Sequence, residues 1–151
     1  MKKVGLLAVL AAGALAIAGC GKTAKTIDAE ALAGRLVEEI AYEDTLELVD
    51  EDTVSMSMTV PEGVSSIMYM GSGSTAEEVG VFTAPDKETA AETMEEVKVF
   101  LDDQADAFED YIPEETKRVG NAVLEQKENY VILCVSGDPD AAKEIIEEAF
   151  Q

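Results

Sequence analysis

The chain has 151 residues and a formal net charge of −21, from 32 acidic and 11 basic residues. A field this negative repels phosphate backbones, which excludes a nucleic-acid-binding protein. The sequence has no histidine and no tryptophan, and the lack of histidine excludes Ser-His-Asp catalysis, Cys-His catalysis and histidine-based zinc sites.

The first twenty residues have the pattern of a secretion signal. Lys2 and Lys3 form a basic start, an uncharged apolar run covers residues 4–18, and small residues precede Cys20. The apolar run is shorter than the about 20 residues that a membrane-spanning helix needs, which favours a cleaved signal over a transmembrane helix. We therefore expect a signal peptide at residues 1–19, a small-residue tether at residues 20–27 and one domain at residues 28–151.

The segment Ile17-Ala18-Gly19-Cys20 resembles the lipobox of bacterial lipoproteins. The resemblance implies a diacylglycerol on Cys20 and cleavage just before it, which removes two lysines and no acid and leaves a mature chain of charge −23. Two acyl chains hold a protein stably on a bilayer, because each buried methylene adds about 0.8 kcal/mol. We expect a lipid-anchored protein on the extracytoplasmic face of the cell membrane.

After the tether, the chain predicts a helix and then an ambiguous segment. Asp28 is a helix cap, and apolar residues at helical spacing predict a helix from Ala29 to Tyr42. Residues 50–60 fit two structures, because residues 54–60 alternate like a strand while Asp50 or Asp52 can cap a short helix. Apolar segments at residues 64–70 and 77–83 flank a Gly-Ser loop and predict a hairpin.

The second half repeats this order with a longer helix. Asp86 caps a helix that we expect to end near Pro113, and a strand at residues 119–124 follows. A turn at residues 127–129 then leads into an apolar strand at residues 130–135, and Asp138 with Pro139 starts a final helix. The order helix, hairpin, long helix, hairpin, helix predicts an α+β two-layer sandwich: an antiparallel four-stranded sheet with helices mainly on one face and the other face open.

From Asp28 to Phe150 the chain resembles a family of small lipoproteins of Gram-positive Firmicutes, catalogued as domain of unknown function 4358. The segments that carry the resemblance are Tyr69-Met70, residues 76–82, residues 108–115, residues 129–136 and the helix after Asp138. The resemblance implies the same fold, anchoring and cell type. It implies no activity, because the family has none established.

The two cysteines have separate expected roles. Cys20 is the lipidation site, which leaves Cys134 without an intramolecular disulfide partner. Cys134 lies in an apolar strand-like run, where a cysteine is usually a small buried hydrophobe.

Two weak metal sites are candidates. Met56, Met58, Met68 and Met70 form two Met-x-Met pairs that would bind Cu(I) if they lay on neighbouring strands, although the same alternation is typical of core methionines. Asp106, Glu109 and Asp110 would bind Ca²⁺ loosely at the acidic end of the long helix, or would form a solvated face.

The sequence therefore predicts a lipoprotein with no catalytic residue and no cofactor. Its expected partners are the membrane, through Cys20, and another cell-envelope component, and nucleic acid is excluded. The alternative is a module that binds a metal or a small ligand.

Overall fold

The computed structural model describes residues 25–151, so the predicted signal peptide and most of the tether lie outside the described residues. An antiparallel sheet in the order β1-β2-β3-β5-β4 forms its centre. The strands are β1 (Glu47–Val49), β2 (Ser65–Met70), β3 (Glu78–Thr83), β4 (Val123–Lys127) and β5 (Tyr130–Val135). The helices are α1 (Ala29–Glu39), α2 (Glu51–Ser57), α3 (Lys87–Glu109), α4 (Pro113–Gly120) and α5 (Pro139–Ala149).

Aspartate caps start α1, α3 and α5 where the sequence predicts them. Asp28 accepts a hydrogen bond from the Ala31 N–H at 3.0 Å, Asp86 from Thr89 at 2.8 Å and Asp138 from Ala141 at 3.0 Å. Each cap satisfies an N–H that the first helical turn leaves without a partner. The predicted starts are confirmed, whereas α1 ends at Glu39, earlier than the predicted Tyr42.

The ambiguous segment is a helix. The Asp50 carboxylate accepts from the Thr53 N–H at 2.8 Å and caps α2. Val54 and Met58 are both buried and lie four residues apart, so the segment turns one helical face to the core. The strand alternative for residues 54–60 is therefore wrong.

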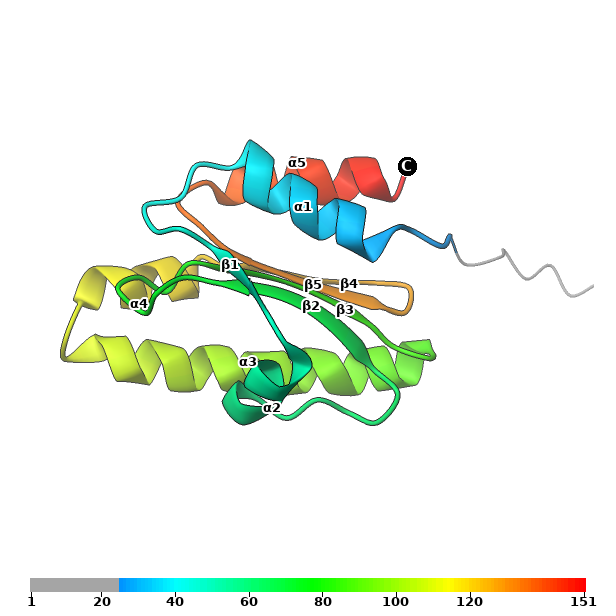
Figure 1. Cartoon of the computed structure of the whole chain (residues 1–151), viewed down its shortest axis with the longest axis horizontal. Helices are drawn as coiled ribbons and strands as arrows, with labels where there is room; N and C mark the ends of the chain where they lie inside the picture. Colours follow the sequence, from blue (N-terminus) through cyan, green and yellow to red (C-terminus); the bar gives the residue numbers. More distant parts are fainter. Residues whose placement is uncertain (1–24) are drawn as a thin grey trace, which may run out of the picture.

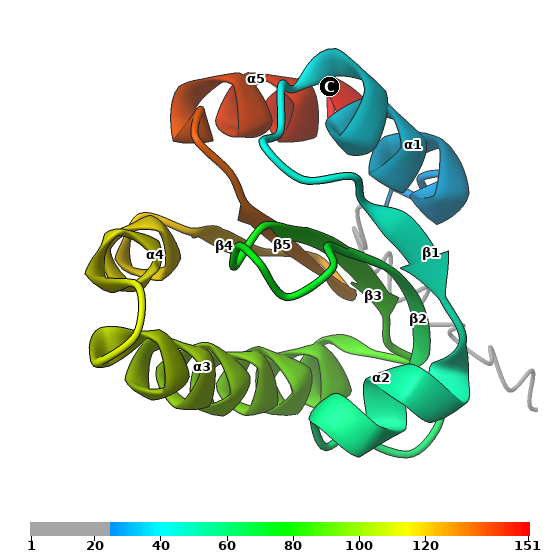
Figure 2. The same cartoon turned by 60° about the vertical axis from the view of Figure 1, so that its left-hand side comes forward.

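The sheet is covered on both faces (Figures 1 and 2). Helices α1 and α5 pack on one face around a core that includes Leu36, Val81 and Ile146. Helices α2 and α3 pack on the other face, around a second core that includes Val54, Phe82 and Val97. The α+β antiparallel fold is confirmed, but the predicted two-layer arrangement with an open sheet face is corrected to three layers.

The central strands explain the third layer. Every residue of β5 is buried, and so are the residues of β3 from Glu78 to Phe82. A strand with one solvated face alternates between apolar and polar residues, whereas a strand covered on both faces is apolar throughout. The uninterrupted apolar run at residues 130–135 is therefore the sequence signal for helices on both faces.

Within residues 25–151 the sheet has five strands in place of the predicted four. The short β1 pairs Leu48 with Tyr69 at the edge of the sheet. The predicted hairpins are confirmed as β2–β3 and β4–β5, the second turning at Glu128, which has a φ of 55°. The strand predicted to begin at residue 119 begins at Val123, because α4 continues to Gly120.

Gly80 lies at the centre of the sheet and yields the first prediction. A Cβ at Gly80 would meet the Phe82 ring at 2.9 Å, and Phe82 is fully buried, so its ring has no free space to enter. We expect Gly80→Ala to lower the free energy of unfolding by about 1–3 kcal/mol in urea titrations.

Gly34 provides the matched control. It lies inside α1, and a Cβ added there would meet no atom of the described neighbouring residues within 4 Å, so Gly34→Ala should raise stability by about 1 kcal/mol through helix propensity. A Gly80→Ala protein as stable as the wild type would contradict the packing described here.

Candidate functional site

A groove of about 560 Å³ lies at the β1 edge of the sheet. Its apolar floor comes from Leu48 of β1 and from Ile67 and Tyr69 of β2, which share the α1 face of the sheet, and Val49 adds to the lining from the α2 face. Leu48 is 62% exposed. We call this feature, with the residues named here and in the next paragraph, the edge groove.

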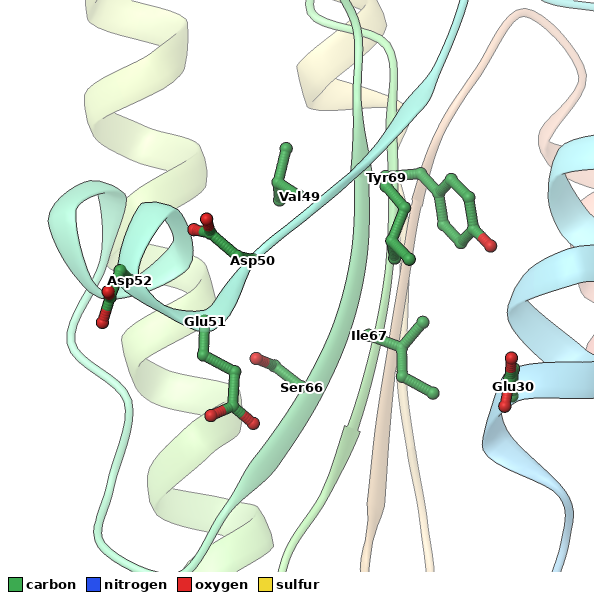
Figure 3. Close-up of a pocket in the computed structure, with 9 residues that line it drawn as sticks. Glu30, Val49, Asp50, Glu51, Asp52, Ser66, Ile67 and Tyr69 are labelled. Atoms are coloured by element: carbon green, nitrogen blue, oxygen red, sulfur yellow. The ribbon is translucent and has the colours of Figure 1, made fainter.

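Carboxylates surround the floor of the edge groove. Figure 3 shows Glu30 of α1 on one side of β2 and Asp50, Glu51 and Asp52 at the start of α2 on the other. All four are exposed, and no lysine or arginine of the described chain lines the groove. Within residues 25–151, Glu30, Glu51 and Asp52 form no ion pair and no side-chain hydrogen bond, so their charge is available to a ligand.

Asp50 has a different role from the other three acids. Its carboxylate accepts the Thr53 N–H that starts α2, and these hydrogen bonds hold the pKa of Asp50 below its usual range. The acid therefore both caps the helix and keeps its negative charge beside the groove.

The main chain of β2 is open along this groove. β1 ends at Val49, opposite Met68, so no strand among residues 25–151 pairs with Ser65–Ile67 on that side. The Gly71 N–H donates to the Glu77 carbonyl on the β3 side at 3.2 Å. The main-chain groups of successive residues in an antiparallel strand point to opposite sides. Ser66 is an odd number of residues from Gly71, so its N–H and C=O point away from β3 and toward the open edge.

A second polar cluster lies around Arg118, and two of its acids, Glu77 and Glu115, are buried. The Arg118 guanidinium lies 3.0 Å from the Glu115 carboxylate and 3.5 Å from that of Glu77, and it also pairs with Glu43. Glu77 accepts the N–H groups of Glu43 and Asp44, both at 2.9 Å, and Glu115 accepts that of Ala76 at 2.7 Å. These bonds join α4 to two loops, so the cluster holds the end of the sheet together.

Glu78 is a buried acid that has no cationic partner within residues 25–151. The residue is 1% exposed, and one carboxylate oxygen accepts from the Gln104 amide at 3.3 Å. Burial raises the pKa of Glu78 to about 8. Strongly raised acids mark functional sites in some proteins, but Glu78 faces a buried amide and does not line the edge groove.

Cys134 is a core residue, as expected from its strand. It is buried, and its sulfur lies 3.5 Å from the Tyr42 hydroxyl. Burial raises the pKa of the Cys134 thiol, which suppresses the nucleophilic thiolate.

The structure separates the methionines of the copper hypothesis. Met58, Met68 and Met70 pack against the same core, whereas Met56 is 80% exposed on α2. Met56 and Met58 belong to a helix and its C-cap, so the expected pair of neighbouring Met-x-Met strands is wrong.

The other predicted site residues lie apart from the edge groove. Asp106, Glu109 and Asp110 are exposed at the end of α3, and no group of three or more Asp, Glu, Cys or His side chains within residues 25–151 is arranged to hold a metal ion. Cys20 lies outside the described residues. No helix in the described part of the chain is both long and apolar enough to cross a membrane.

The edge groove itself was not predicted from the sequence. The sequence carries one local sign of the groove: the Leu-Glu-Leu segment at residues 46–48 lies just before three consecutive acids at residues 50–52. Tyr69 and Ile67 line the same groove only because β1 pairs with β2, and this pairing is a long-range contact.

The comparison with family models agrees with the resemblance to domain of unknown function 4358, over residues 62–136 of the expected 28–150. Residues 62–136 match the family described as "Domain of unknown function (DUF4358)". No curated protein and no solved structure matches the chain.

Proposed function

Since residues 62–136 of this chain belong to a family without an assigned activity, we propose its role from the sequence and the fold. The protein is a lipoprotein, anchored by Cys20 on the extracytoplasmic face of the cell membrane of a Gram-positive bacterium. It binds another component of the cell envelope and catalyses no reaction.

The observation that carries this proposal is the start of the chain. A basic pair, a short apolar run and small residues before Cys20 occur in the order that export and lipid attachment require. A diacylglyceryl group on Cys20 gives the two acyl chains that stable anchoring needs.

Binding rather than catalysis is supported by what the fold leaves open. The edge groove combines a partly exposed apolar floor with acids that have no ion pair among residues 25–151, which are features of interaction surfaces. The Cys134 thiol and the Glu78 carboxyl are buried away from this groove, and the sequence offers no histidine as a base.

Lipid attachment is testable with a fatty acid that carries a clickable alkyne. In a Gram-positive host, we expect the full chain to incorporate the label and Cys20→Ala to incorporate none, because the thioether forms only on a cysteine. Cys134→Ala is the matched control and should be labelled like the wild type. Equal labelling of Cys20→Ala would refute the anchor.

A further inference from the structure

We propose that the edge groove binds an extended, basic segment of a partner protein, which adds as a strand along the open edge of β2. This inference rests on the proposed binding function and names the chemistry of the partner. Strand addition of this kind obtains affinity from main-chain hydrogen bonds and specificity from alternate side chains.

The first support is the unfinished edge. β1 covers only Met68–Met70 of the six-residue β2, and the outward N–H and C=O of Ser66 face the groove. An extended segment following the line of β1 would supply both hydrogen-bond partners.

The second support is the alternation of the floor. Ile67 and Tyr69 are two residues apart on β2, so they project on the same face, and both pack partly against the core beneath α1. Leu48 pairs with Tyr69 and extends this apolar strip. A segment with an apolar residue at every second position would cover the strip.

The third support is charge. Glu30 lies on the α1 side of β2, with the strip, whereas Glu51 and Asp52 lie on the α2 side, and no lysine or arginine of residues 25–151 lines the groove. Lysine or arginine on the incoming segment would therefore gain ion pairs. A second copy of this chain is a poor occupant, because its charge of −21 would repel the first.

The chain's own tether is the other basic segment to consider. Lys25 lines a separate hollow, together with Arg35 and Ala149, between the start of α1 and the end of α5. The described end of the tether therefore approaches α1 from a different side than the edge groove, which favours a partner segment.

The test is a titration of the full chain, purified in detergent, with a fluorescent ten-residue peptide of alternating lysine and valine at physiological salt. We expect saturable binding. A peptide with the same lysines but two central prolines keeps the charge and cannot complete the strand pairing, so it should bind at least tenfold more weakly.

Two matched triple variants test whether binding depends on the acids of the edge groove or on the net charge of the protein. Glu30→Gln/Glu51→Gln/Asp52→Asn should weaken binding at least fivefold. Asp102→Asn/Asp103→Asn/Glu109→Gln removes the same charge from the exposed face of α3 and should change it less than twofold. Ser66→Pro removes the outward N–H at an edge that tolerates proline and should weaken binding while leaving the thermal midpoint nearly unchanged.

Four results would overturn the inference: no saturable binding, equal binding of the proline peptide, equal losses in the two triple variants, or unchanged binding to a folded Ser66→Pro protein. At least fivefold tighter binding to Lys22→Gln/Lys25→Gln would identify the tether as the occupant and would also overturn it. An unlipidated Cys20 would defeat the proposed anchoring but leave this titration unaffected, so the two failures are distinguishable.

Discussion

Replacement of Arg118 by leucine is expected to lower the free energy of unfolding by about 3–5 kcal/mol, because it leaves the buried carboxylates of Glu77 and Glu115 without a cation. Both acids are at most 5% exposed, so water cannot solvate the freed charges. Urea titration at neutral pH measures the loss directly.

The hydrogen bonds of Glu77 and Glu115 prevent the Arg118→Leu protein from relieving this loss of stability by moving a carboxylate into water. Glu77 also holds the N–H groups of Glu43 and Asp44, and Glu115 holds that of Ala76. If either carboxylate moved out to water, it would leave main-chain donors unsatisfied, at about 1–3 kcal/mol for each buried group. The destabilisation should therefore spread to the loops before β1 and before β3.

A surface arginine provides the control for Arg118. Arg35 pairs with Glu39 at 2.7 Å and Glu148 at 2.8 Å, but its side chain and both partners are well exposed. Arg35→Leu should cost no more than about 1 kcal/mol. Arg118→Lys keeps a charge and should fall between the wild type and Arg118→Leu; a loss below about 1 kcal/mol in Arg118→Leu would show that the cluster contributes little.

The second large effect is expected at Glu78 and depends on pH. Its pKa is about 8 in the folded protein, against an ordinary value of 4.5, so between these values the folded state holds a proton that the unfolded state has released. Stability from this group is complete below pH 4.5 and is lost as the pH rises through 8. The loss is on the order of 3–5 kcal/mol, at about 1.4 kcal/mol per pH unit.

Glu78→Gln should remove this dependence. Within residues 25–151, the two buried side-chain oxygens without a partner, Glu78 Oε1 and Gln104 Oε1, belong to this one pair of side chains. A proton on Glu78, or the amide of a glutamine there, provides the missing donor. We expect Glu78→Gln to match the wild type near pH 4.5 and to be the more stable protein by several kcal/mol above pH 8.

The difference between the two proteins is the quantity to measure, because the other acids of the chain titrate equally in both. Urea titrations at pH 5, 7 and 9 would follow it, with the exposed Glu92→Gln as control. A stability difference that stays constant with pH would show that Glu78 is already ionised in the folded protein.

Local signals in the sequence account for the parts of the fold that were predicted. The caps Asp28, Asp86 and Asp138 act within three residues, so the starts of their helices follow from the sequence alone. The two hairpins follow from turn residues between neighbouring apolar runs.

Long-range contacts decide the parts that were missed. For residues 50–60, the alternating apolar pattern favours a strand, whereas the Asp50 cap and the burial of Val54 favour a helix. The burial of Val54 depends on tertiary packing, so the sequence alone does not decide between the two. Buried acids such as Glu77, Glu78 and Glu115 resemble the solvated ones in sequence. The edge groove depends on β1 stopping at Val49, three residues short of covering β2.

The amino-terminal peptide of the protein, recovered from its native membrane and analysed by mass spectrometry, tests the central claim most directly. We expect a chain that starts at Cys20 and carries the mass of a diacylglyceryl group on that residue. A chain that still begins at Met1, or a Cys20 without lipid, would contradict it.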